Sequence, residues 1–113
     1  MTLDQYQAAA RRTQNPALTY EEKRNHALFG MCSEVGELHA LYQKRYQGHE
    51  ISKEKVKDEV SDVMWFVAEF CDSEGLTMEE VAQHGDRKLK KRYPDGFNEE
   101  RSVNREEYRH ETD

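Results

Sequence analysis

The chain has 113 residues with 23 acidic and 17 basic side chains, a formal net charge of −6, and only 35% apolar residues. This length predicts one domain, and a mean hydropathy of −1.12 without a run of about 18 apolar residues excludes a protein that spans a membrane. The segment 95–113 carries −4 of the net charge, so the remaining body is nearly neutral and does not favour binding to nucleic acid.

Start and stop signals divide the chain into four predicted helices, at about residues 3–14, 20–47, 53–74 and 78–92. The signals are the capping boxes Thr2–Gln5, Thr19–Glu22 and Thr77–Glu80, the N-cap Ser52, the C-terminal glycines Gly48 and Gly75, and the breakers Pro16 and Pro94. No strand-like alternation of useful length is present, so the sequence predicts an all-α fold.

The two long helices are expected to carry the core. Their apolar residues follow helical spacing, in one stripe on each helix. The stripes are Leu28, Met31, Cys32, Val35, Leu38 and Tyr42 on the first, and Val56, Val60, Val63, Phe66, Val67 and Phe70 on the second. The short connection 48–52 predicts an antiparallel hairpin with flanking helices. Because the apolar content is low, we expect hairpins from different subunits to assemble into a four-helix-bundle-type oligomer.

The ends of the chain and its cysteines indicate the compartment. We expect residues 1–97 to form the domain and residues 98–113 to form a polar, acidic C-terminal tail. The N-terminus lacks a basic start followed by an apolar stretch, so no signal peptide is expected. Cys32 and Cys71 both fall inside apolar helical patterns, which is typical of reduced core cysteines. These features predict a cytoplasmic protein.

Acidic pairs on the long helices are the first candidate for chemistry. Pairs at i,i+3 spacing are Glu34/Glu37, Glu59/Asp62 and Glu69/Asp72. Spacing alone carries little weight, because so acidic a chain produces such pairs by chance. Helical geometry places Glu34 and Glu59 within the apolar arcs of their helices, with Glu37 and Asp62 just outside. Carboxylates clustered there must be paired or bound to a cation, and oxygen ligands suit Mg²⁺, with Mn²⁺ as the alternative. The competing interpretation is pairing with Lys or Arg on a neighbouring helix.

Basic residues are the second candidate. The stretch 87–92 holds five bases in six residues. Such bases offset the dipole at the end of a helix, and they are also the usual donors to phosphate. Lys44 lies two turns beyond Glu37 on nearly the same face, roughly 10 Å away. That distance suits the far end of a polyphosphate.

A tryptophan, two mid-helix glycines and the histidines are further residues of interest. Trp65 is a candidate for stacking on a base, with a dimer contact as the alternative. Gly30 and Gly36 lie in mid-helix, where glycine is costly, so we expect them to permit close helix approach or room for a ligand. The histidines of the helical region show no paired metal spacing and are expected at the surface or in the hairpin. They are His26, His39, His49 and His84.

Three blocks of sequence carry a resemblance. Residues 34–37 read EVGE and residues 59–62 read EVSD, with 21 residues between them. Residues 30–38 read GMCSEVGEL and residues 88–97 read KLKKRYPDGF. In this order the blocks resemble the MazG-like nucleotide pyrophosphohydrolases of the all-α NTP pyrophosphatase superfamily. The resemblance covers about residues 25–105.

The resemblance implies Mg²⁺-dependent hydrolysis of a nucleoside triphosphate, NTP or dNTP, to the monophosphate and pyrophosphate, in the control of nucleotide pools. It matches Glu34, Glu37, Glu59 and Asp62 to the metal-binding, catalytic carboxylates of the family. It also implies self-association as a dimer or tetramer.

The same resemblance matches Lys44, Lys88 and Arg92 to basic positions near the phosphates. Two departures leave an alternative open: many relatives have Glu where Ser33 stands, and many have Asn where this chain has Gly85-Asp86. The alternative is a catalytically inactive helical dimer of the same fold that acts as a nucleotide sensor or interaction module.

Overall fold

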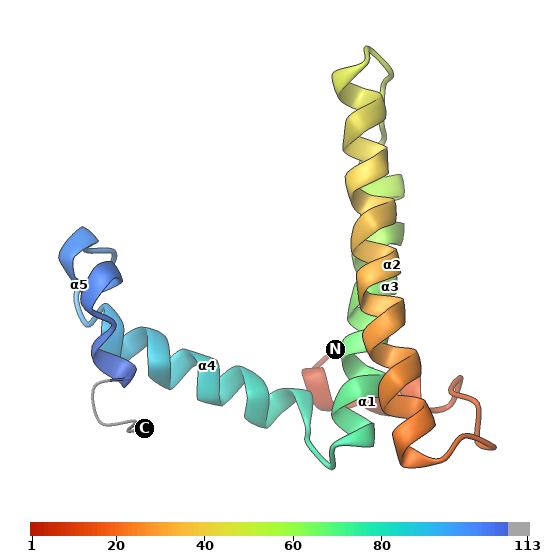
Figure 1. Ribbon diagram of the computed structural model, residues 1–113, viewed down its shortest axis with the longest axis horizontal. Coiled ribbons are helices and arrows are strands. Elements are labelled where there is room, and N and C mark those ends of the chain that lie inside the picture. Colours follow the sequence, from red (N-terminus) through yellow and green to blue (C-terminus); the bar gives the residue numbers. More distant parts are fainter. Residues whose placement is uncertain (109–113) are drawn as a thin grey trace. The chain divides into compact units, whose positions relative to one another are not determined.

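The protein is helical throughout, and its computed structural model describes residues 1–108 (Figure 1). The elements are α1 (Leu3–Arg11), α2 (Tyr20–Tyr46), α3 (Lys53–Ser73), α4 (Met78–Arg92), α5 (Glu99–Asn104) and the 3₁₀ helix η1 (Glu106–Tyr108). Residues 1–108 contain no strand, which confirms the predicted all-α class. None of the helices in this range has the length and apolar character that crossing a bilayer requires.

The chain divides into two compact units, Met1–Met78 and Glu79–Asp113. The first unit contains α1, α2, α3 and the first residue of α4, and the second contains the rest of α4 with α5 and η1. The expected domain 1–97 runs across both units, and its boundary stays a prediction.

The predicted helix signals are confirmed in the local geometry of the backbone. Thr2 and Thr19 each accept a hydrogen bond from the backbone three residues later, and the side chain there returns one, which completes two capping boxes. Ser52 opens α3 in the same way by accepting from a backbone N–H at 3.1 Å. Gly48 and Gly75 follow α2 and α3 with φ values of 99° and 69°, which glycine adopts without steric cost.

The expected C-terminal tail contains a short helix that the sequence analysis does not predict. Asn98 opens α5 by accepting from the backbone N–H of Arg101 at 3.0 Å. Arg105 ends it with a left-handed φ of 48°. Asn98 is a favourable N-cap residue, but no apolar stripe follows it, so hydrophobic periodicity cannot reveal this helix.

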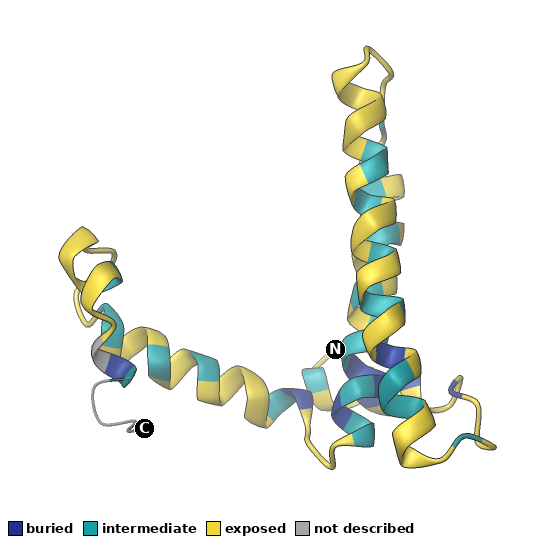
Figure 2. Cartoon of the chain, in the orientation of Figure 1, coloured by how far each residue is buried: buried dark blue, intermediate teal, exposed yellow. Residues whose placement is uncertain are grey.

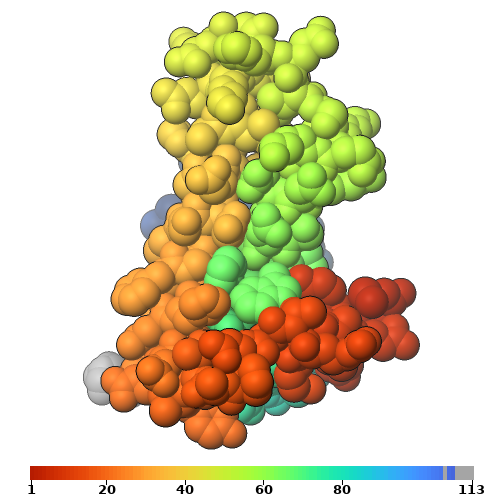
Figure 3. Space-filling model, turned by 90° about the vertical axis from the view of Figure 1, so that its right-hand side faces the viewer, coloured from red at the N-terminus to blue at the C-terminus, as the bar shows by residue number. Residues whose placement is uncertain are grey.

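α2 and α3 form the predicted antiparallel hairpin, and α1 packs against α3. The two long helices lie side by side in Figure 3, with α2 in orange to yellow and α3 in green, and in Figure 1 α2 lies in front of α3. In Figure 3, α1 (red) lies against the lower part of α3. Within the first unit, α3 thus packs against both α2 and α1.

α2 carries two stripes at coiled-coil spacing, and only one of them faces α3. The inner stripe, buried or half-buried, is Ala27, Met31, Glu34, Leu38 and Leu41. The outer stripe, exposed throughout, is Leu28, Cys32, Val35, His39 and Tyr42. Both stripes alternate steps of four and three residues. The predicted single stripe mixed members of both and is wrong, because spacing shows which residues share a face but not which face meets the neighbouring helix.

The buried core of the first unit is small and lies beside α1. It consists of Ala10, Ala68, Cys71 and Met78, with Leu3, Tyr6, Trp65 and Val67 packed against it. Figure 2 shows the buried residues gathered at one end of the hairpin, while the other end is exposed. Both cysteines are reduced, as expected, and Cys71 lies in the core. The predicted core position of Cys32 is wrong, since this residue belongs to the outer stripe and is exposed.

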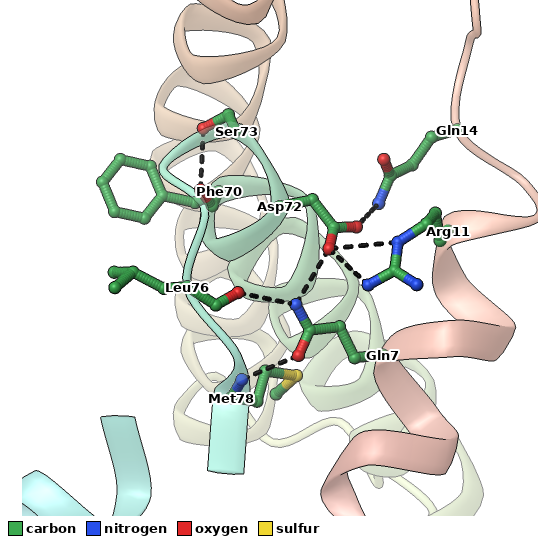
Figure 4. Close-up of polar contacts among 8 residues, drawn as sticks. All are labelled: Gln7, Arg11, Gln14, Phe70, Asp72, Ser73, Leu76 and Met78. Carbon is green, nitrogen blue, oxygen red and sulfur yellow. Dashed lines mark hydrogen bonds and ion pairs between the residues drawn. The ribbon is translucent and has the colours of Figure 1, made fainter. Parts of the chain in front are cut away.

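Asp72 on α3 holds α1 in place by accepting hydrogen bonds from three side chains (Figure 4). Gln7 and Arg11 donate to Oδ1 at 2.8 Å, and Gln14 donates to Oδ2 at 2.8 Å. Gln7 also donates to the carbonyl of Leu76 and accepts from the backbone N–H of Met78. Burial raises the pKa of Asp72, but the bonds from Arg11, Gln14 and Gln7 outweigh it, so this pKa lies below its ordinary value.

We expect Asp72→Asn to destabilise the protein by about 1–3 kcal/mol at pH 7, because two donors would lose an acceptor and Arg11 would lose its carboxylate. An acid whose pKa is lowered by folding stabilises the folded state above its unfolded pKa of about 3.9 and loses this effect at lower pH. The difference between wild type and Asp72→Asn should therefore shrink below about pH 4 in urea unfolding. Asp58→Asn, at an exposed position of the same helix, is the control. A difference that stays constant with pH would show that the charge is not its source.

Candidate metal centre

Three carboxylates converge at mid-length of the hairpin. Glu34 comes from the inner stripe of α2, and Glu59 and Asp62 come from α3. One carboxylate oxygen of each lies within 4.8 Å of the others. Glu34 and Glu59 are half-buried and Asp62 is exposed, as helical geometry predicts. The two helices thus bring together three of the four predicted acids.

The electrostatics of this cluster favour a cation. Partial burial and the charges of Asp62, Glu59 and Glu37 raise the pKa of Glu34. Burial and the charge of Asp62 also raise the pKa of Tyr6. Carboxylate oxygens crowded in this way are the donor set that Mg²⁺ and Mn²⁺ prefer. The residues present therefore fit a divalent metal.

The competing interpretation, pairing with a basic side chain, applies to Glu59. Lys55 Nζ lies 3.6 Å from Glu59 Oε1, one turn away on the same helix. The lysine side chain is 56% exposed, so solvent weakens this ion pair. A single exposed lysine offsets one charge of three, and the cluster retains its negative potential.

The fourth predicted acid lies apart. Glu37 is exposed on α2 and does not belong to the group of three. It is close enough for its charge to raise the pKa of Glu34. Its predicted role as a ligand stays a prediction.

An open groove of about 480 Å³ adjoins the carboxylates. Its lining consists of Glu34 and Asp62 together with Thr13, His26, Trp65 and Phe66. The indole N–H of Trp65 donates to Thr13 Oγ1 at 2.8 Å, and its ring packs edge-on against Phe66 at 5.0 Å between centroids. The ring is therefore fixed in position, with acids and aromatic side chains lining the same groove.

Gly30 allows α2 to approach the ring of Phe66. A Cβ atom at residue 30 would lie 2.1 Å from Cε1 and 2.3 Å from Cδ1 of Phe66. At Gly36, no described atom lies within 4 Å of the corresponding position. The expected close approach is confirmed at Gly30, whereas Gly36 borders open space.

The predicted phosphate contacts lie on two different units. Lys44 is exposed in the last turn of α2 in the first unit. In the second unit, Arg92 forms a hydrogen-bonded ion pair with Glu107. Lys88 lies 4.7 Å from the centroid of the Tyr108 ring and lowers the pKa of that hydroxyl through a hydrogen bond. Within the second unit, Glu107 and Tyr108 thus contact two of the three predicted bases, Arg92 and Lys88.

Two polar residues that sequence reasoning left without a role are paired beside the groove. Glu69 is completely buried, and its Oε1 lies 2.6 Å from Nδ1 of His26. His26 is exposed, with 52% of its side-chain surface accessible, which confirms its expected surface position. A signal for both residues exists in the sequence: His26 precedes Glu34 by eight residues, and Glu69 follows Asp62 by seven. A spacing of seven residues returns to the same face of a helix, and one of eight lies about 80° beyond it, so Glu69 shares the face of Asp62 and His26 lies beside that of Glu34.

Comparison with families of known proteins gives one finding. A family model described as the MazG nucleotide pyrophosphohydrolase domain matches residues 24–97. No curated protein and no solved structure matched the chain. The matched segment contains all three clustered carboxylates, the groove residues of α2 and α3, and the basic stretch 87–92.

Proposed function

The chain belongs to the MazG nucleotide pyrophosphohydrolase family, and from this premise we propose that it hydrolyses nucleoside triphosphates, NTP or dNTP, to the monophosphate and pyrophosphate. The observation that carries the proposal is the convergence of Glu34, Glu59 and Asp62 on one another from two helices. We assign the activity to the control of nucleotide pools in the cytoplasm.

The carboxylates have two tasks in this proposal. Glu34, Glu59 and Asp62, with Glu37 beside them, would hold Mg²⁺, and Mn²⁺ is the alternative. The bound cation supplies charge neutralisation at the phosphates and a more acidic water. A carboxylate oxygen not used as a ligand accepts the proton of the attacking water.

The basic residues and Trp65 would bind the rest of the substrate. Lys44, Lys88 and Arg92 are proposed to contact the phosphates. Because Arg92 is paired with Glu107, a phosphate would compete with this carboxylate for the guanidinium group. Trp65 lines the groove and is proposed to contact the base.

We also propose that the outer stripe of α2 pairs with a second copy of the chain, in a dimer or tetramer of hairpins. Leu28, Val35 and Tyr42 follow one another at seven-residue intervals, and 41%, 52% and 43% of their surfaces are exposed. Coiled-coil spacing of exposed apolar residues is what a facing helix would cover.

Val35→Glu is expected to weaken this association at least about tenfold, because it buries an unpaired charge in the interface. The measurement is molar mass by light scattering over a dilution series. Ala9→Glu, at an exposed position of α1, is the matched control and should leave the mass unchanged. A wild-type protein that is monomeric at every concentration would contradict the proposed assembly.

The experiment that tests the function is release of pyrophosphate from each common NTP and dNTP, with Mg²⁺ and with a chelator. Release that depends on the metal is expected for at least one substrate. No release from any of them would contradict the enzymatic proposal. Thermal stabilisation by nucleotide and Mg²⁺ without turnover would favour the alternative, a nucleotide sensor, which the exposed Ser33 in place of a common glutamate keeps open.

A further inference from the structure

Glu69 is a buried acidic residue that the metal centre does not use. Its side chain has no exposed surface, and Oε2 has no hydrogen-bond partner among residues 1–108. Burial of a carboxyl group with one partner lowers stability, and an apolar residue would serve the fold better. Among the residues that the structure describes, the one hydrogen-bond partner of this carboxyl group is His26, at 2.6 Å. This contact therefore indicates that the role of Glu69 is to orient His26.

The pair lies in the same seam as the clustered carboxylates. On α2, His26, Gly30 and Glu34 follow one another at intervals of four residues. On α3, Phe66 lies opposite Gly30 and Glu69 lies opposite His26. His26 is thus about 12 Å from Glu34 along the helix axis, two turns away.

The groove connects the two positions. His26 lines it together with Trp65, Phe66 and the carboxylates Glu34 and Asp62. The imidazole ring packs against Phe66 at 5.5 Å and edge-on against Trp65 at 6.3 Å between centroids. If the phosphates lie at the carboxylates, as the proposed function requires, the nucleoside extends along the groove towards these rings.

The hydrogen bond to Glu69 determines which ring nitrogen of His26 is exposed and whether that nitrogen donates or accepts a hydrogen bond. An ionised carboxylate only accepts hydrogen bonds, so beside ionised Glu69 the ring proton of His26 is on Nδ1, which donates to Oε1. Nδ1 faces a carboxylate without exposed surface, so the exposed half of the ring, in a side chain that is 52% exposed, carries Nε2. In the neutral ring this nitrogen is a hydrogen-bond acceptor.

We propose that His26, oriented by Glu69, accepts a hydrogen bond from the exocyclic amino group of the base. This deepens the proposed function and rests on it. The contact makes the site prefer cytosine or adenine nucleotides over uracil or hypoxanthine nucleotides, which carry a carbonyl oxygen at the same position. Two acceptors facing each other would leave Nε2 without a donor, and such mismatches give strong discrimination. His26 is then a specificity-determining contact and Glu69 its positioning residue.

The test compares CTP with UTP and ATP with ITP at pH 8.5. Wild-type protein is expected to show at least about a tenfold higher kcat/KM for the amino member of one pair. His26→Ala should bring that ratio to about one, mainly through a higher KM for the amino substrate, because the contact stabilises ground state and transition state alike. His84→Ala, exposed on α4, should keep the wild-type ratio.

Glu69→Gln tests the positioning role without removing the imidazole ring. The amide can donate to Nδ1, which moves the ring proton to Nε2 and turns the acceptor into a donor. The preference should then disappear or invert, although the ring stays in place. Removal of a buried charge is compatible with folding, so this variant remains informative if His26→Ala does not fold.

Calorimetric binding of α,β-methylene-CTP and α,β-methylene-UTP gives a second readout that needs no turnover. Tighter binding of the cytosine analogue, lost in both variants, is expected. Equal binding of the two analogues by the wild type, or a preference that survives His26→Ala, overturns the inference. Absence of pyrophosphate release with a His26-dependent binding preference would instead refute only the proposed hydrolysis.

Discussion

Replacement of Glu59 by Gln is expected to lower kcat/KM for pyrophosphate release by more than about 100-fold while leaving the protein folded. Loss of a group that only supports a metal ligand costs roughly 10–100-fold, and Glu59 is proposed to be a ligand itself. The change removes one charge from the cluster, so the pKa of Glu34 should fall towards its ordinary value. The stabilisation of the protein by Mg²⁺ in thermal unfolding should shrink as well.

The metal-free stability of Glu59→Gln should stay within about 0.5 kcal/mol of wild type, because relief of repulsion offsets loss of the exposed Lys55 pair. Glu54→Gln is the matched control, as it makes the same change in the first turn of α3, outside the cluster. It should keep the wild-type kcat/KM. Unchanged activity in Glu59→Gln would show that the metal centre lies elsewhere.

Gly30→Ala is expected to destabilise the first unit by about 1–3 kcal/mol, despite the better helix propensity of alanine. The new methyl group would fall 2.1 Å from the ring of Phe66, which cannot move without disturbing Trp65 and His26. Each kcal/mol corresponds to about 4–8 °C in the melting temperature of a domain of this size. Thermal unfolding therefore measures the effect directly, and activity should fall with it because the groove is displaced.

Two further variants separate a steric cause from a general effect of alanine. Gly36→Ala places the same methyl group in open space on the same helix and should raise stability by up to about 1 kcal/mol. Phe66→Leu in the Gly30→Ala background should recover part of the loss, since coupled residues in contact show non-additive energies. Wild-type stability in Gly30→Ala would contradict the close approach of α2 and α3.

Local signals in the sequence are sufficient for the four longer helices and for the positions of Glu34 and Glu59. Caps such as Thr19 and Ser52 act through their own backbone neighbours, so their geometry does not depend on the rest of the fold. The seam position of Glu34 and Glu59 followed from helical spacing relative to their own apolar neighbours. Both kinds of inference stay within one helix, which is why the structure confirms them.

Features that depend on two elements could not be predicted in this way. The pairing of His26 with Glu69 requires the register of α2 against α3, which spacing within one helix does not contain. The exposure of Cys32 depends on which arc of α2 meets α3. The contact of Arg92 with Glu107 depends on the fold of a segment without an apolar stripe. The predicted phosphate-binding roles stay predictions for the same reason.

The one-residue offset between the inner and outer stripes of α2 constrains where residues can be inserted or deleted in this protein. An inserted or deleted residue turns the rest of a helix by about 100°. A single deletion within residues 20–26 would therefore bring the outer stripe onto the inner positions, turn Val35 towards α3 and carry Glu34 out of the seam. Segments 12–19 and 47–52 connect the helices and have no such register. Gaps among descendants of this chain should accordingly fall in these connections, and the lengths of α2 and α3 should be inherited as strictly as the carboxylates they carry.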